Sequence, residues 1–196
     1  MPEPISAQAI DQLFTKARTY PGWLDKPVSD ELLHKLYDLM KWGPTSANGS
    51  PARILFVKSS AAEERLLKCV MPLNADKIKA APVTAIVAQD TEFYEHLPKL
   101  APHADFRSYF AGNKSFAEAT AFRNSSLQGA YLIMAARALG LDTGPMSGFD
   151  NAKVDEEFLK GTTWKSNFIC NIGYGDPASL KPRLPRLTFD EACKII

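Results

Sequence analysis

The chain of 196 residues has few cysteines, almost no net charge and no long apolar segment. Cys69, Cys170 and Cys193 are odd in number and far from any CxxC spacing, which argues against a disulfide framework or a zinc ribbon. The three histidines are scattered and no HExxH motif occurs, so we expect no metal site. With 23 Lys and Arg against 22 Asp and Glu, the chain lacks the basic field that a nucleic-acid partner requires.

A membrane helix needs about 20 consecutive apolar residues. The longest such run, residues 130–139, already contains Arg137. The opening residues, MPEPISAQAIDQ, have neither the basic nor the apolar region of a secretion signal. We therefore expect a cytoplasmic protein without a membrane partner. A composition of 45% hydrophobic and 23% charged residues, with no repeat or low-complexity linker, predicts one domain over residues 1–196.

Apolar periodicity predicts helices that alternate with short buried strands. The expected strands cover 54–57, 83–88 and 167–172, and the expected helices cover 30–42, 61–70, 118–139 and 150–159. The central part of the helix over 118–139, residues 125–139, is apolar or small nearly all round, which indicates burial on every side. Residues 92–117 are rich in aromatics and prolines without a clean period, and we interpret them as a lid or binding excursion. The alternation of strands and helices indicates a layered α/β or α+β domain.

Nucleophile motifs such as GxSxG are absent, and so are glycine-rich phosphate loops. An enzyme with this sequence would therefore take its reactivity from a cofactor. Three polar segments suit a ligand: residues 43–51, residues 144–150 and the basic run 181–186. Ordinary turns explain the first two equally well, and a solvated basic tail explains the third.

Several motifs follow one another in an order that is specific to one family. They are Arg18-Thr19, GPTSANGSPAR, Asn74-Ala75-Asp76-Lys77, LGLDTGPMSGFD and a basic run that contains Lys181, Arg183 and Arg186. In this order the whole chain resembles the nitroreductase superfamily of FMN oxidoreductases. The resemblance implies an α+β nitroreductase-like fold, a mixed sheet flanked by helices. It also implies a homodimer with FMN at the interface and NADH or NADPH as the co-substrate.

The resemblance also assigns roles to individual residues. The implied FMN-binding residues are Arg18, Thr19, Pro44, Thr45, Ser46, Asn48, Asn74, Lys77, Pro145, Met146, Ser147, Gly148, Lys181, Arg183 and Arg186. The basic residues at both chain ends would hold the phosphate, and residues 44–48 would approach the flavin of the opposite subunit. Lys77 would lie near N1 and O2 of the flavin, and the backbone N–H groups of residues 145–148 would bond N5 and O4.

The segments MKWGPTSAN, EFYEHLP, ATAFRNSS and DTGPMSGFD are most similar to the subgroup that contains malonic semialdehyde reductase. This similarity implies ping-pong hydride transfer from NAD(P)H, through flavin N5, to a small aldehyde acid. Arg107 is the candidate for gripping the substrate carboxylate, with Arg123 as the alternative, and Tyr94 or water would supply the proton. Two other readings stay open: reduction of nitro compounds or quinones, and a flavin-binding module without turnover.

Overall fold

The computed structural model describes residues 3–196 and centres on one four-stranded sheet. The strands lie in the order β1 (Ala52–Val57), β2 (Val83–Asp90), β4 (Trp164–Gly173) and β3 (Asp142–Met146). Each neighbouring pair of these strands is antiparallel. Among the described residues, the parallel pairing expected of a mixed sheet is confined to the bridge between Thr19 and Thr143. The fold is α+β, as predicted.

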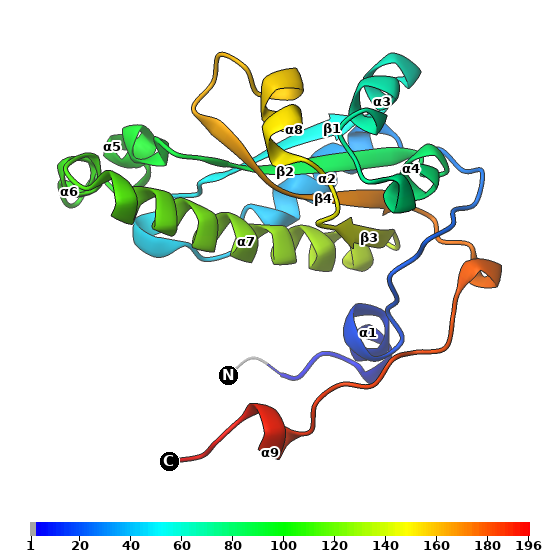
Figure 1. Ribbon diagram of the computed structural model, residues 1–196. Coiled ribbons are helices and arrows are strands. Elements are labelled where there is room, and N and C mark those ends of the chain that lie inside the picture. The colour runs from blue at the N-terminus through cyan, green and yellow to red at the C-terminus, as the bar shows by residue number, and fades with distance from the viewer. Residues whose placement is uncertain (1–2) are drawn as a thin grey trace.

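Helices cover both faces of the sheet (Figure 1). They are α2 (Asp30–Met40) and α7 (Lys114–Ala138) on one face, and α3 (Ser60–Leu67), α4 (Pro72–Lys79) and α8 (Asn151–Phe158) on the other. On the first face, Leu36 and Leu132 share one core cluster with Val83. On the second face, Ile78 shares another cluster with Ile86. The sheet is therefore buried on both sides, which explains why its strands read as nearly continuous apolar runs.

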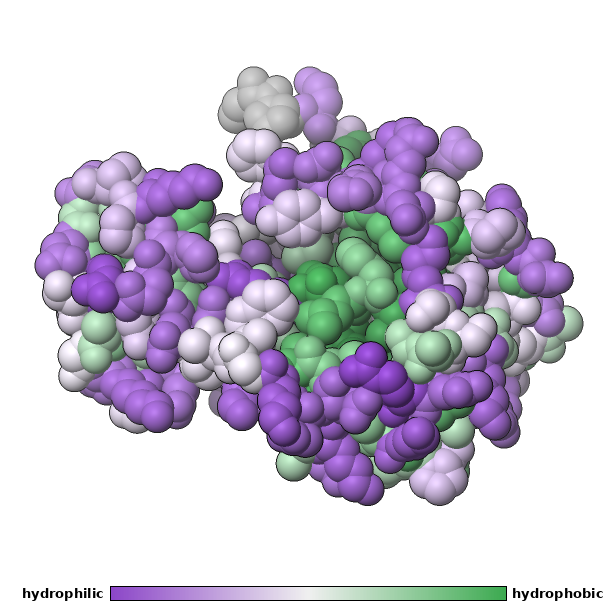
Figure 2. Space-filling model, turned by 90° about the horizontal axis from the view of Figure 1, so that it is seen from above, coloured by the Kyte–Doolittle hydropathy of each residue, from purple (hydrophilic) through white to green (hydrophobic). Residues whose placement is uncertain are grey.

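Residues 92–117 and the start of α7 form a lobe at one end of the sheet, on the left in Figure 1. The lobe contains η3 (Phe93–His96), α5 (Leu97–Leu100) and α6 (Phe106–Ala111). Phe93, Leu97 and Phe110 form its own core against Ala117 and Ala121 of α7. Figure 2 shows the same lobe standing to the left of a hollowed apolar area bordered by hydrophilic residues. A segment without a clean period thus has its own apolar centre.

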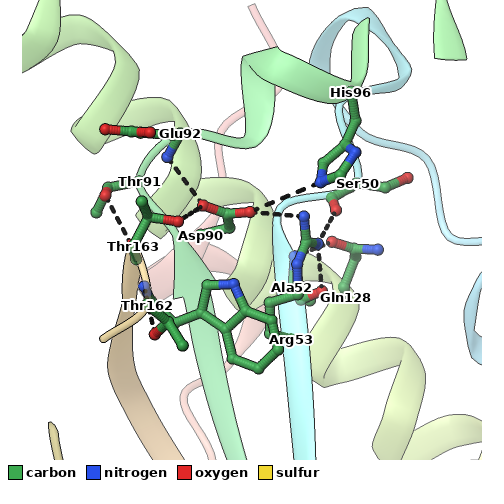
Figure 3. A network of polar contacts seen from close by, with 11 residues as sticks. Ser50, Ala52, Arg53, Asp90, Thr91, Glu92, His96, Gln128, Thr162 and Thr163 are labelled. Atoms are coloured by element: carbon green, nitrogen blue, oxygen red, sulfur yellow. Dashed lines mark hydrogen bonds and ion pairs between the residues drawn. The ribbon is translucent and has the colours of Figure 1, made fainter. Parts of the chain in front are cut away.

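A buried carboxylate fixes the base of this lobe (Figure 3). Asp90, the last residue of β2, accepts hydrogen bonds from Arg53 at 2.7 Å, from Thr163 at 2.6 Å and from the backbone N–H of Glu92 at 3.0 Å. His96 lies 4.0 Å from the same carboxylate. Since Asp90 is 4% exposed, removing its partners would leave a charge without compensation. These bonds therefore hold the end of β2, where the chain enters the lobe, in a fixed position.

The two chain ends run together on the side of the sheet that carries α7 (Figure 1). They contain α1 (Ala7–Ile10), η1 (Asp11–Thr15), η4 (Pro177–Ser179) and α9 (Phe189–Ala192). Residues 181–196 are exposed throughout, and among them Leu187 is 70% and Ile195 89% exposed. Apolar side chains in this segment have no cover within the described chain.

The long helix α7 differs from the expectation of burial on every side. Leu132 and Ala136 are buried against the sheet, but Phe122, Leu127 and Tyr131 are 55%, 48% and 42% exposed. A helix with this sequence pattern needs cover all round, and one chain covers only one side of it. No helix within residues 3–196 has both the length and the apolar character needed to cross a bilayer.

Candidate functional site

Helix α4 presents two polar residues to the segment that follows β3. Asn74 and Lys77 are three residues apart, so their side chains lie on one face of the helix. Lys77 Nζ donates to Asn74 Oδ1 at 3.1 Å, and Asn74 Nδ2 donates to the carbonyl of Gly148 at 3.0 Å. The Asn74 carboxamide is thereby fixed at both ends, by a neighbour on its own helix and by Gly148, which is far away in the sequence.

Gly148 is close to Asn74 because it has no side chain. A Cβ at this position would lie 2.4 Å from Asn74 Nδ2, well inside van der Waals contact. Among residues 3–196, the backbone N–H groups of Ser147 and Gly148 donate to no protein acceptor. Pro145 and Met146 end β3 and pair with Cys170 and Ile169. The predicted segment 145–148 therefore offers two free donors beside a lysine ammonium.

The sheet supports this cluster from behind. Thr84 of β2 donates through Oγ1 to Asn171 Oδ1 of β4 at 2.8 Å. Asn171 Nδ2 in turn donates to the backbone carbonyl of Lys77 at 2.7 Å. Sequence reasoning missed both residues, although each is a polar residue inside an apolar run, VTAIVA and NFICNI.

The basic residues of the two chain ends meet at the other end of β3. Arg18 donates to the carbonyl of Lys181 at 2.5 Å, and Arg183 donates to the carbonyl of Ala17 at 2.8 Å. Thr19 forms the parallel bridge to Thr143, which places this basic cluster beside β3. Arg186 is different, because its described bonds go to the carbonyls of Leu184 and Pro185 in its own segment.

The predicted loop over residues 44–48 is bonded to α7 and to the lobe, and not to the Lys77 cluster. Ser46 N donates to Asn124 Oδ1 of α7 at 2.8 Å, and Asn48 Nδ2 donates to the carbonyl of Leu100 at 2.8 Å. Thr45 Oγ1 accepts from the N–H of Ser50 at 3.0 Å, while Pro44 is exposed. Within residues 3–196, no hydrogen bond connects this loop to Asn74, Lys77 or residues 145–148.

The same loop contains the three non-glycine residues of the described chain that have positive φ. These are Ala47 at 51°, Asn48 at 52° and Ser50 at 42°, within the short η2 turn (Ser46–Asn48) and just after it. Such backbone angles are costly for residues with a side chain and are often found at functional positions. Asn48 also lines a cavity of about 1240 Å³ along α2 and β1, which Asn74 and Lys77 do not line.

The three candidate residues for substrate contact differ in their partners. Arg107 makes a bidentate ion pair with Glu95, with Nε and Nη2 at 2.8 and 2.9 Å from the carboxylate oxygens. Arg123 lies exposed on α7 beside Asn124 and, within residues 3–196, forms no ion pair. Burial, followed by the nearby Glu92 and Glu95, raises the pKa of Tyr94. A phenol with a raised pKa stays protonated at neutral pH, which is the form that a proton donor needs.

The donor set fits an FMN molecule. Arg18 and Arg183 supply cations for a phosphate at one end of β3. Lys77 and the N–H groups of Ser147 and Gly148 suit the polar edge of a flavin at the other end. Strand β3 therefore connects a site suited to a phosphate with a site suited to the edge of a flavin ring.

The chain is similar to several known proteins. Residues 22–174 match the Nitroreductase family. A provisionally named NADH dehydrogenase/NAD(P)H nitroreductase from Burkholderia lata is 63% identical, covering 97% of this chain and 98% of that protein. The structure of a provisionally named nitroreductase from Bacillus subtilis superposes with a TM-score of 0.87 at 20% identity, covering 97% of this chain and 100% of that one.

A second solved structure, a provisionally named nitroreductase from Exiguobacterium sibiricum in complex with FMN, superposes with a TM-score of 0.86. It is 16% identical and covers 100% of both chains. Likeness at this identity establishes the fold, and the match over residues 22–174 establishes the family. The chain belongs to the nitroreductase family.

Proposed function

We propose that this protein is an FMN-dependent NAD(P)H oxidoreductase. One observation carries the proposal: β3 connects the Arg18 and Arg183 cluster to the cluster of Lys77, Asn74 and Gly148. The names of the curated relatives, NADH dehydrogenase and NAD(P)H nitroreductase, support it, and so does the related structure solved with FMN. The site has cations and backbone donors and contains no protein nucleophile, as expected where a cofactor performs the chemistry.

Each part of the chain then has a defined task. FMN, when bound, would supply the chemistry of hydride transfer between NAD(P)H and the acceptor. Arg18, Lys181 and Arg183 would hold the phosphate by charge-assisted hydrogen bonds. The N–H groups of Ser147 and Gly148 would bond the N5 and O4 edge, and the Lys77 ammonium would stabilise negative charge at N1 and O2. Asn74 orients that ammonium through the bond at 3.1 Å.

A homodimer with the site at the subunit interface belongs to the same proposal. Leu127 and Tyr131 are about one turn apart on α7, and one chain leaves both apolar side chains partly uncovered. Phe122 is 55% exposed on another side of the same helix, and Trp42 is 78% exposed in the loop after α2. Apolar faces of this kind typically mark protein contacts. The loop over 44–48, held by Asn124 at the same helix, would then reach the flavin of the second subunit.

The acceptor we propose is a small aldehyde acid such as malonic semialdehyde. Its carboxylate needs a cation, and the two candidate arginines differ in availability. Arg107 is already compensated by Glu95, whereas Arg123 is exposed next to the residue that anchors the 44–48 loop. We therefore assign the carboxylate to Arg123 and leave the proton to Tyr94 or water. Reduction of nitro compounds or quinones is the second candidate, and the names of the curated relatives favour it.

A spectrum of the purified protein tests the central claim. Flavin absorption that bleaches under anaerobic conditions on addition of NADH or NADPH is the expected result. Bound flavin that stays oxidised would support a binding module without turnover. A preparation that binds no FMN would contradict the proposal. Initial rates with malonic semialdehyde, a nitroaromatic compound and a quinone would then rank the acceptors.

A further inference from the structure

Two polar side chains lie inside the apolar sheet directly behind the Lys77 cluster. Thr84 on β2 and Asn171 on β4 are register partners and are 2% and 1% exposed. Their strand neighbours Ala85 and Cys170 have no exposed surface. Burying a polar group costs free energy unless hydrogen bonds satisfy it. Two apolar residues at these positions would pack without that desolvation cost. The pair therefore calls for an explanation other than packing.

The two hydrogen bonds of this pair have a fixed direction. Thr84 Oγ1 donates to Asn171 Oδ1 at 2.8 Å, so the amide oxygen faces the threonine and the amide nitrogen faces away. That nitrogen donates to the carbonyl of Lys77 at 2.7 Å. Lys77 is in the last turn of α4, where carbonyl groups have no partner within the helix. Thr84 thus selects the Asn171 orientation that caps this carbonyl.

Lys77 is consequently held at both ends. Asn171 fixes its backbone from the sheet, while Asn74 accepts a bond from its ammonium at 3.1 Å and donates to Gly148. A continuous series of bonds runs from the dry interior of the sheet to the proposed flavin edge. The effect of a charge depends on its distance from the group it acts on, and the dependence is steep where water is excluded.

We propose that Thr84 and Asn171 are positioning residues that set the place of the Lys77 ammonium, and with it the preference of the site for reduced over oxidised FMN. This inference rests on the proposed function, in which FMN binds beside Lys77. Neither residue touches the cofactor in this scheme. They act through the backbone of Lys77.

The test compares Thr84→Val with Thr84→Ser. Valine keeps the shape of threonine without the donor, whereas serine keeps the donor. The readout is the midpoint potential of bound FMN relative to free FMN, measured by equilibration with a redox dye. We expect Thr84→Val to lower the preference for reduced FMN by about threefold to tenfold, about 14 to 30 mV for a two-electron couple. Thr84→Ser should retain the wild-type potential.

Two further variants complete the design. Thr120→Val also removes a buried threonine hydroxyl, but on α7 and outside this series of bonds, so its potential should equal that of the wild type. Asn171→Ala should lower the potential at least as much as Thr84→Val, and it carries the test if Thr84→Val folds poorly. A shift with Thr120→Val as large as that with Thr84→Val would overturn the inference.

Lys77→Met separates this inference from the proposed function. If the wild type binds no FMN, or Lys77→Met leaves the potential unchanged, the placement of FMN beside Lys77 is wrong, and the inference falls with it. If Lys77→Met lowers the potential while Thr84→Val and Asn171→Ala do not, the FMN site stands and the positioning role is overturned.

Discussion

The Asn74 carboxamide occupies the space that a side chain at Gly148 would need. Its Nδ2 lies 3.0 Å from the Gly148 carbonyl and would lie 2.4 Å from a Cβ at that position. A helix on one face of the sheet and the segment after an edge strand therefore meet without an intervening atom. Most of the proposed flavin edge depends on this contact.

Gly148→Ala should displace Asn74 and weaken FMN binding by about tenfold, with a loss of about 1–3 kcal/mol in the free energy of unfolding. Fluorescence titration with FMN and thermal unfolding would measure the two effects. Ser147→Ala is the matched control, because it removes an exposed side chain and keeps the backbone N–H. Unchanged affinity in Gly148→Ala would show that the contact between Asn74 and Gly148 does not shape the cofactor site.

Arg18→Ala should weaken FMN binding by about ten- to a hundredfold, because a charged hydrogen bond to phosphate is worth about 1.5–3 kcal/mol. Flavin retained after dialysis gives a direct readout. Lys16→Ala removes a nearby exposed cation that pairs with Asp11 and should retain the flavin. Equal losses in both variants would indicate a diffuse electrostatic effect in place of a phosphate site.

Leu127→Glu should destabilise the proposed dimer, because it places a charge in the uncovered apolar face of α7. Sedimentation at decreasing protein concentration would show that the variant dissociates at a higher concentration than the wild type, with release of FMN. Ala152→Glu adds the same charge at an exposed position on α8 and should leave the association unchanged. A wild-type monomer that keeps its flavin and its activity would refute the dimer.

Arg123→Ala should raise the KM for malonic semialdehyde by about tenfold or more and leave turnover with an uncharged quinone close to wild type. Only the acid substrate would use the cation. Arg107→Ala should have a smaller effect, since Glu95 already compensates that guanidinium. The opposite order of effects would return the carboxylate to Arg107, and the absence of activity toward any aldehyde acid would favour nitro compounds or quinones.

Alkylation of the native protein at about pH 8 should modify Cys193 alone. Cys193 is exposed, whereas burial raises the pKa of Cys170 to about 12 and also raises the pKa of Cys69. A thiol with so high a pKa stays protonated at this pH and is a poor nucleophile. Mass spectrometry should find one modified cysteine in the folded protein and three in denaturant. Rapid labelling of Cys170 in the native state would contradict the burial of β4.

Sequence patterns predict an element correctly where that element carries its own capping residue and its own apolar face. Ser29 accepts from Leu32 N and begins α2 as predicted, and Asp150 caps α8 in the same way. The apolar strands were located to within a few residues because both faces of the sheet are covered. The two elements that build the proposed flavin edge, α4 and β3, are not predicted by these local patterns.

Tertiary contacts explain these omissions. β3 contains Gly144 and Pro145, which are poor strand residues, and it forms because β4 offers an open edge. Helix α4 is eight residues long with little apolar periodicity, and only Ile78 anchors it in the core. The resemblance supplied Asn74, Lys77 and Gly148 individually, but sequence alone could not supply the bonds that join them.

The lobe that begins after Asp90 has a further consequence for engineering. It has a core of its own around Phe93 and Phe110, and the ion pair of Asp90 with Arg53 fixes the point where it leaves the sheet. The flavin-edge residues lie elsewhere, on α4 and after β3. We therefore expect that one contiguous segment between Thr91 and Asn113 can be exchanged with that of a relative without unfolding the sheet, provided that the backbone carbonyl at position 100 still accepts the bond from Asn48.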